Sequence, residues 1–480
     1  MNVDAMPDRT PSQGPIPLTE IRFNPESYAD PNGRVFVWRG QLYRGISAPR
    51  AAFYRSLFQQ GIIQELIDQE LLVKTELTDL TLEGYSLVLR HERVPFVTYP
   101  FNWCGEMLRD AGLRVVKLEQ ELCKQGLTLQ DAHSYNVLFD GPNPRFIDFG
   151  SIVRMDPQAP GWPDDEFCRF FVNPLRLAAC DQGRIARALL LDDLLGVLPG
   201  EVTPFLAGDE RDTGKPWRRA SAFIPARLRS RAGRVFRRLK RSVQTPSEQQ
   251  AHLQAPLSRL LEGHRESLSS LALPPPERDG VTRPSEPLTP SASWTARAHT
   301  IARVLSELKP ATVLDLQPQD GWFALMAARL GARTVTVDED EARISRIYRA
   351  ARRDRLPILP LVMSIFRLSR PLGQLNHRKA IVAKRLVSDM VFAGELVPQL
   401  VGTHWLDFHK IARLLSEFSR KWVLVEWLPA GDPSIGFPIL ERYPSYQLDQ
   451  FRAALLKRFA QVELLLSHPQ ERAFLLCTKH

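Results

Sequence analysis

The stretch from residue 311 to residue 341, ATVLDLQPQDGWFALMAARLGARTVTVDEDE, constrains the fold more than any other part of the chain. An apolar run ends at Asp315, a turn contains Gly321, and an Ala- and Leu-rich segment stops at Gly331. A second apolar run ends at Asp338, 23 positions after Asp315. This order predicts strand, turn, helix and strand, with turn amides and a helix N-terminus facing a ligand. An acid ending the second strand is a usual partner of ribose hydroxyls, so the spacing predicts a nucleoside-cofactor site.

The residues that follow continue the alternation of strands and helices. The expected strands are 358–363, 389–394, 422–427, 462–467 and 473–478, and the expected helices are 405–420 and 448–459. Alternating strands and helices indicate a parallel sheet, whereas the five residues between the last two strands can join only antiparallel neighbours. We therefore expect an α/β fold whose parallel sheet ends in an antiparallel hairpin.

A parallel sheet with this ending resembles the Rossmann-like sheet of class I S-adenosylmethionine (SAM)-dependent methyltransferases. The resemblance implies that Asp315, Gln317 and Gly321 belong to the cofactor turn and that Asp338 binds the ribose. The turn departs from the family pattern because Gln317 and Gln319 stand where glycines are usual. A Cβ at a positive-φ position costs about 1 kcal/mol and can obstruct the ligand, so a weakened or decayed cofactor site is the alternative.

A second pattern lies in residues 127–152, LTLQDAHSYNVLFDGPNPRFIDFGSI. It contains Asp131 and Asn136, then a turn, a short strand and Asp148 in Asp-Phe-Gly. The segment resembles the catalytic segment of aminoglycoside- and choline-kinase-type phosphotransferases, where the first Asp orients the acceptor and the other two residues hold magnesium. No glycine-rich phosphate loop precedes it, and Arg44 stands where a strand lysine would be expected. These features predict a truncated, α+β kinase-like region.

The two patterns together resemble a bacterial family of large SAM-dependent methyltransferases, some of which are labelled nodulation-related. The resemblance includes the run at 88–113 and covers residues 25–175 and 290–480. It implies a retained kinase-like remnant and a C-terminal domain that transfers a methyl group from SAM to a small-molecule or biosynthetic acceptor (EC 2.1.1.-). It names no particular acceptor, and the sequence indicates no catalytic residue.

Shifts in composition predict five segments. We expect a disordered tail at 1–20, a kinase-like region at 21–200, a basic and largely helical connection at 201–270, a linker at 271–293 and the methyltransferase-like domain at 294–480. The linker holds six prolines and little apolar periodicity, which favours an extended chain.

Positive charge is concentrated between Lys215 and Arg241, where eleven basic residues and no acidic one occur in a chain of net charge +9. Apolar residues recur there at helical spacing, so we expect an amphipathic helix. The alternatives are a solvated surface helix, a weak contact with an anionic surface, and a contact with nucleic acid. The last is disfavoured because no stacking aromatic residues are interleaved.

The chain has no run of eighteen apolar residues and no basic-then-apolar leader, so we expect a cytoplasmic protein without a transmembrane segment. Its five cysteines are never arranged as C-x-x-C, which favours reduced thiols, and no ligand spacing indicates a metal site. Three functions remain open. They are SAM-dependent methyl transfer, Mg-ATP-dependent phosphoryl transfer through Asp131, Asn136 and Asp148, and a non-catalytic scaffold with both sites decayed.

Overall fold

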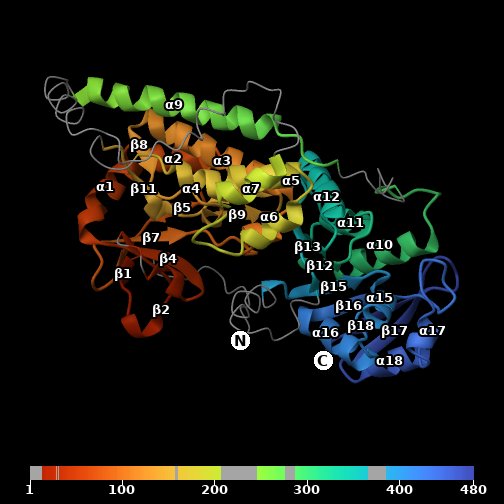
Figure 1. Cartoon of the computed structure of the whole chain (residues 1–480). Helices are drawn as coiled ribbons and strands as arrows, with labels where there is room; N and C mark the ends of the chain where they lie inside the picture. The colour runs from red at the N-terminus through yellow and green to blue at the C-terminus, as the bar shows by residue number, and fades with distance from the viewer. Residues whose placement is uncertain are drawn as a thin grey trace. The chain divides into compact units, whose positions relative to one another are not determined.

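The computed structural model describes residues 13–28, 30, 32–156, 161–206, 246–275, 287–365 and 385–480. The basic segment 215–241, residues 1–12 of the predicted tail and residues 276–286 of the predicted linker lie outside the described residues. The chain divides into two compact units, whose helices and strands are labelled in Figure 1. The first comprises Met1–Pro95, Leu108–Leu138 and Pro144–Leu273, and the second comprises Phe96–Met107, Phe139–Asn143 and Pro274–His480.

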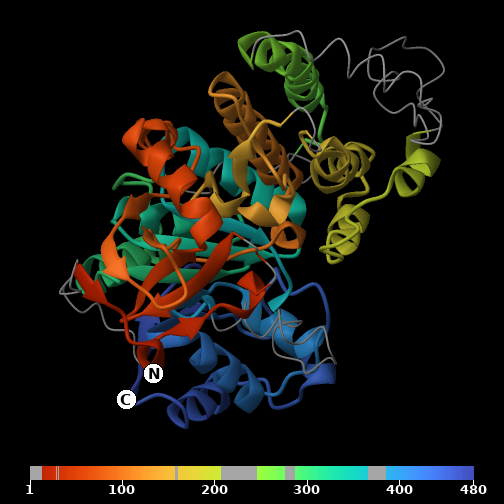
Figure 2. The same cartoon turned by 90° about the vertical axis from the view of Figure 1, so that its left-hand side faces the viewer.

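An antiparallel five-stranded sheet opens the first unit, in the order β2-β3-β4-β7-β5 (red to orange in Figure 2). Its strands are β2 (Arg22–Phe23), β3 (Gly33–Trp38), β4 (Gln41–Ile46), β5 (Thr75–Leu77) and β7 (Leu87–His91). The rings of Phe36 and Tyr43 stack 5.5 Å apart within a buried cluster on this sheet. Burying aromatic area of this kind is what stabilises a small sheet in water.

The strand β1 (Gln13–Pro15) pairs in parallel with β6 (Asp79–Thr81). Ile16, the next residue, is only 4% exposed, and the Trp38 indole donates a hydrogen bond to Glu20 at 2.9 Å. Residues 13–20 are therefore ordered, which corrects the prediction of a disordered tail as far as residue 20. The reason is physical: one buried isoleucine and a short ladder hold a proline-containing segment that has no periodic apolar signal.

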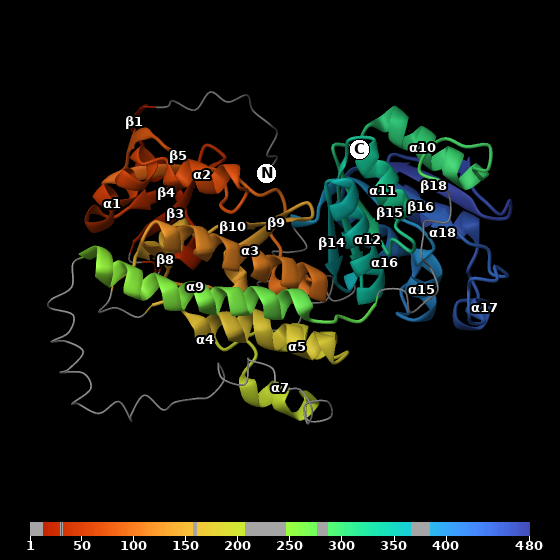
Figure 3. The ribbon, with the colours of Figure 1, turned by 90° about the horizontal axis from the view of Figure 1, so that it is seen from above.

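Helices and short strands complete the first unit. The helices are α1 (Ala48–Gln59), α2 (Ile62–Asp68), α3 (Gly105–Lys124), α4 (Asp164–Phe167), α5 (Asn173–Ala179), α6 (Gly183–Leu189), α7 (Pro199–Leu206) and α9 (Pro246–Ser270). A π-helical turn, η6 (Cys168–Val172), joins α4 to α5. Helix α9 lies along α3 (Figures 1 and 3), where the Gln254 side chain donates to the carbonyl oxygen of Cys123 at 2.6 Å.

The kinase-like segment is built from short elements. The strand β8 (Leu127–Leu129) pairs antiparallel with β11 (Ile152–Arg154), and β9 (Val137–Asp140) pairs with β10 (Asn143–Phe146). Two 3-10 turns, η4 (Ser134–Asn136) and η5 (Phe149–Ser151), lie between these strands along the chain. This hairpin between Asn136 and Asp148 agrees with the turn and strand expected there.

A seven-stranded sheet forms the centre of the second unit, in the order β14-β13-β12-β15-β16-β18-β17. Its strands are β12 (Thr312–Leu316), β13 (Arg333–Asp338), β14 (Ile358–Val362), β15 (Ser388–Ala393), β16 (Ser419–Trp427), β17 (Gln461–Leu466) and β18 (Ala473–Thr478). The first five run parallel, and β18 is antiparallel to both β16 and β17. The predicted α/β class and the predicted antiparallel ending are both confirmed.

Helices flank this sheet, with α10, α11 and α12 on one face and α16 and α18 on the other (Figure 1). Their bounds are α10 (Ala296–Leu308), α11 (Trp322–Arg329), α12 (Glu341–Asp354), α15 (Leu396–Gly402), α16 (Phe408–Phe418), α17 (Ile439–Arg442) and α18 (Leu448–Leu456). Thr295, Asp340 and Asp407 each cap a helix by accepting backbone N–H groups. Among the described helices, none has the length and apolar character that crossing a bilayer requires.

Aromatic side chains fill the core on both faces of the sheet. On the face of α11, the rings of Phe323 and Phe392 stack 3.8 Å apart and nearly parallel. On the face of α16 and α18, the Trp427 and Tyr446 rings stack at 4.4 Å, and Phe408 contacts both. The sheet is thus fixed from both sides, and the ends of its parallel strands are held in register.

Candidate functional site

The strand β12 carries Asp315 into a fully buried position near its carboxyl end, with 0% of the residue exposed. Neither carboxylate oxygen has a hydrogen-bond partner among the described residues. Burial, chiefly, raises the pKa of Asp315 well above its ordinary value, although the positive charge of Arg297 opposes the effect. A buried acid without a partner is costly, so the geometry suits a cationic or hydrogen-bond-donating ligand group at this point.

The turn after β12 keeps a left-handed backbone at three positions. The φ angles are 60° at Gln317, 51° at Gln319 and 82° at Gly321. The Gln317 N–H donates to the carbonyl oxygen of Val337 at 3.0 Å, which ties the turn to the end of β13. Two glutamines therefore adopt the conformation that glycine takes most easily, at a cost of about 1 kcal/mol each.

Gly321 is the position in this turn that tolerates no side chain. A Cβ at Gly321 would lie 2.8 Å from Cγ1 of Ile347 on α12. Gly321 is also the N-cap of α11 and has a left-handed backbone conformation. Asp320 accepts the N–H of Trp322 at 3.0 Å and helps to start that helix. Glycine is required here by both packing and backbone.

The Gln317 side chain is also fixed. Its Nε2 donates to Oε1 of Gln399 on α15, while its own Oε1 is buried and has no partner in the described part of the chain. Gln399 thus has a role in holding the turn.

Asp338 ends β13 and is 4% exposed. It accepts the backbone N–H of Asp340 at 2.8 Å, and an Arg343 guanidinium nitrogen lies 3.4 Å from its other oxygen. Burial raises the pKa of Asp338, and these contacts partly offset the effect. The acid thus lies at the carboxyl end of its strand, where a ribose-binding acid was predicted, and it forms an ion pair with the partly exposed Arg343, five positions along the chain.

Ion pairs at the same end of the sheet were not found from the sequence. Glu426, the last residue but one of β16, is 0% exposed and accepts from Arg297 at 3.1 Å and from Ser467 at 2.7 Å. Arg472 joins Glu395 to Asp432, at 2.6 Å and 2.7 Å. No local sequence signal links these residues.

The ion pair with Arg472 changes the pKa of Asp432 strongly. Burial alone would raise the pKa of Asp432, but hydrogen bonds from Arg472 and Ser434 outweigh it and lower the pKa to about 2. Asp432 and Glu426 are therefore held in structural pairs, and neither is available as a general base.

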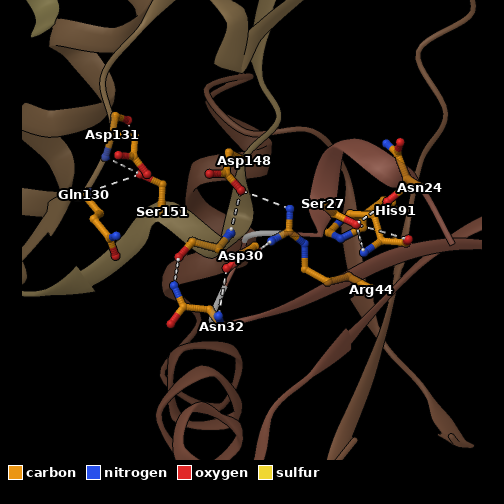
Figure 4. Close-up of polar contacts among 12 residues, drawn as sticks. Asn24, Ser27, Asp30, Asn32, Arg44, His91, Gln130, Asp131, Asp148 and Ser151 are labelled. Atoms are coloured by element: carbon orange, nitrogen blue, oxygen red, sulfur yellow. Dashed lines mark hydrogen bonds and ion pairs between the residues drawn. The ribbon is translucent and has the colours of Figure 1, made fainter. Parts of the chain in front are cut away.

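The kinase-like segment of the first unit contains an ionic cluster, drawn in Figure 4. The Arg44 guanidinium, on β4, donates to Asp30 at 2.6 Å and to Asp148 at 3.0 Å, and its side chain is only 7% exposed. The same Asp148 oxygen accepts the N–H of Gly150 at 3.2 Å. A Cβ at Gly150 would collide with a terminal nitrogen of Arg44. The carboxylate expected to hold magnesium is therefore paired with an arginine of its own unit, which it shares with Asp30.

The other two residues predicted for phosphoryl transfer have different surroundings. Asp131 is fixed through its backbone, since its N–H donates to Ser151 Oγ at 2.9 Å (Figure 4). Burial and then the neighbouring Glu166 raise the pKa of Asp131. The side-chain nitrogen of Asn136 is buried and unpartnered in the described residues. In the part of the chain that the structure describes, no hydrogen bond or ion pair joins the side chains of Asp131, Asn136 and Asp148 to one another.

These features define an α/β protein with buried acids at the carboxyl edge of a parallel sheet. No protein-family model matches the chain. Along 444 residues the chain is 22% identical to nodulation protein NoeA of Rhizobium meliloti (strain 1021), which covers 90% of this chain and 91% of NoeA. The predicted resemblance to a bacterial family with nodulation-related members is confirmed by this nearly full-length relative.

Solved structures match shorter parts. The bifunctional kinase-methyltransferase WbdD is 22% identical over 38% of each chain, with a TM-score of 0.28. The N-methyltransferase NodS of Bradyrhizobium japonicum WM9 is 12% identical, with a TM-score of 0.27, and the match covers 38% of this chain and 93% of NodS. The chain thus spans less than half of the length of WbdD.

Replacing Arg44 by methionine should destabilise the first unit by up to about 3 kcal/mol, because Asp30 and Asp148 would lose their shared, buried counter-charge. Urea unfolding followed by tryptophan fluorescence measures the change. The matched control is Arg39→Met, since the Arg39–Glu20 pair is half exposed, and that change should cost less than about 1 kcal/mol. Equal effects of the two substitutions would contradict a special role for Arg44.

Replacing Asp315 by asparagine should stabilise the second unit at neutral pH. The folded state raises the pKa of Asp315, so its contribution to stability is present below the unfolded-state pKa of about 4 and is lost as the pH rises. We expect the thermal midpoint at pH 7 to rise by about 2–4 °C, the response to about 1 kcal/mol in a domain of this size. The gain should shrink toward pH 4. Calorimetry with the exposed Asp449→Asn as control checks both points, and a midpoint lowered at pH 7 would show that Asp315 has a stabilising partner.

Proposed function

We propose that the second unit is a SAM-dependent methyltransferase domain with a Rossmann-like, class I sheet, acting on a small-molecule or biosynthetic acceptor. The observation that carries the proposal is the buried, unpartnered Asp315 carboxylate beside a turn with a left-handed backbone at Gln317, Gln319 and Gly321. A site of this kind suits a ligand with a positive group and a nearby anionic group.

The strand order supports the class. Numbered along the chain, the sheet runs 3-2-1-4-5-7-6, and only the seventh strand is antiparallel. The order reverses between β12 and β15, and open α/β sheets bind ligands beyond the carboxyl ends of the strands at such a point. Asp315 and the turn lie at that reversal.

The residues present fit SAM. Asp315 would face the ammonium group of the methionine part, and Asp338 would accept from the ribose hydroxyls. When bound, SAM supplies a methyl group activated by the sulfonium charge. The left-handed backbone at the two glutamines supports this fit, because the turn keeps the conformation that glycine usually supplies.

Among the described residues, several acids at this end of the sheet are held in ion pairs and are not free to act as bases. Glu426 and Asp432 are committed to arginines, and Gln399 holds the turn. Methyl transfer would then depend on holding an already nucleophilic oxygen, nitrogen or carbon in line with the methyl group. We include a cytoplasmic location in the proposal, on the basis of the cysteine pattern in the sequence.

Calorimetric titration of SAM and S-adenosylhomocysteine into the intact chain tests the proposal. We expect dissociation constants on the order of micromolar, weakened at least about tenfold by Asp338→Asn and by Asp315→Asn. The exposed Asp449→Asn, on α18, should bind as the unmodified chain does. A folded protein that releases no heat with either ligand would reject the methyltransferase and favour the non-catalytic scaffold.

We further propose that the kinase-like region is a remnant that does not transfer phosphate. Arg44 forms an ion pair with Asp148, the expected magnesium ligand, and its positive charge would repel a cation at that carboxylate. Mg-ATP should therefore leave the thermal midpoint of the first unit unchanged, as measured by calorimetry. A stabilisation that needs both magnesium and ATP, and that disappears in Asp148→Ala, would establish the phosphotransferase alternative through Asp131, Asn136 and Asp148.

A further inference from the structure

Three potential metal ligands converge in the first unit, and none of them belongs to the two sites described above. They are Asp164 on α4, Cys168 at the start of η6 and His264 on α9. Their ligand atoms, a carboxylate oxygen, a sulfur and an imidazole nitrogen, all lie within 4.8 Å of one another. His264 lies 100 positions from Asp164 in the sequence, so ligand spacing could not have revealed the cluster.

The local fold explains the convergence. Asp164 and Cys168 are four residues apart, and the N–H of Cys168 donates to the carbonyl oxygen of Asp164, so both side chains lie on one face of the same helical turn. The π-helical turn η6 begins at Cys168. Turns of this kind are uncommon in helices and are frequent at functional sites.

Helix α9 supplies the third group in a fixed orientation. His264 is 8% exposed, its ring packs 4.9 Å from that of Phe167, and its Nε2 lies 2.6 Å from Oδ1 of Asp164. A histidine held by an aromatic neighbour and a carboxylate has little rotamer freedom left to lose when it binds an ion.

The donor set matches one class of ion. Sulfur, imidazole nitrogen and a single carboxylate oxygen suit zinc and similar transition metals, whereas magnesium and calcium prefer oxygen ligands alone. Ligands about 2.0 Å from a tetrahedral ion lie about 3.3 Å from each other. Small side-chain rotations would be enough to reach this geometry. They would lengthen the 2.6 Å distance between Asp164 and His264 and shorten any distance among the three ligand atoms that lies near the upper limit of 4.8 Å.

Solvent access to the cluster also favours the binding of a metal ion. Asp164 is partly exposed, with a side-chain exposure of 36%, which leaves room for entry and for water as a fourth ligand. A cysteine thiol has an ordinary pKa of about 8.5, so it carries its proton for the most part at neutral pH. Binding would replace the S–H bond by a sulfur–metal bond and release that proton to the buffer.

We propose that Asp164, Cys168 and His264 form a binding site for a zinc-type transition-metal ion, with water in the fourth position. The ion clamps α9 to α4, two helices that are joined by the Asp164–His264 hydrogen bond and the Phe167–His264 ring contact. The site is independent of the proposed methyltransferase activity, since all three ligands belong to the first unit.

Cobalt(II) and zinc(II) titrations of the chelator-treated intact chain test the site. Cobalt(II) should bind with one equivalent and produce visible bands of tetrahedral coordination together with a near-ultraviolet thiolate-to-metal band. Zinc(II) should displace it and release about one proton per ion, read from calorimetry in two buffers of different ionisation enthalpy.

The variants locate the ion. Cys168→Ser should abolish the thiolate band and weaken zinc(II) binding at least about 100-fold. Loss of a residue that only hydrogen-bonds to a metal ligand usually weakens binding by about 10- to 100-fold, so a direct ligand should cost at least as much. Cys180→Ser, which changes a half-buried thiol of the same unit, should leave the spectrum unchanged. Asp164→Asn alters a partly exposed ligand with little change of shape, so it tests the site even if the cysteine variant folds poorly, and it should weaken binding as well. Absence of a stoichiometric spectrum, or a thiolate band that persists in Cys168→Ser, would overturn the proposal.

Discussion

The parallel pairing of β12 with β13 is the constraint on which the ligand-facing edge of the second unit depends. Asp315 pairs in register with Thr336, and the Gln317 N–H reaches the carbonyl oxygen of Val337. The ends of the two strands therefore coincide, and an acid at each end is carried to the same edge. A shift of one residue would turn Asp315 to the opposite face of the sheet and separate it from the turn.

The sequence predicted the second unit well because its signals are local. Strand lengths, the turn at Gly321 and the short connection before β18 all act over a few residues. The positions of Asp315, Gly321 and Asp338 follow from the same short-range pattern. A prediction of this kind needs only the periodicity of strands and helices and the length of the turns.

What the sequence could not predict is formed by pairs that are distant along the chain. Arg44 and Asp148 are 104 positions apart, and Arg472 and Glu395 are 77 apart. The two glutamines in the turn were expected to weaken the site, since a Cβ is unfavourable there, but the structure keeps the left-handed backbone at both. The main-chain hydrogen bond to Val337 holds the conformation and does not depend on which side chain is attached.

Arg44 and Gly150 constrain each other in a way that bears on how the first unit can change by mutation. The arginine nitrogen fills the space that any side chain at position 150 would enter, and Asn32 and Tyr54 both donate to the Gly150 carbonyl oxygen. A larger residue at position 150 would push the Arg44 guanidinium away from Asp30 and Asp148 and would also approach Oδ2 of Asp30, at 3.0 Å. We therefore expect positions 44 and 150 to change together during evolution, because either change alone separates two carboxylates from their shared counter-charge.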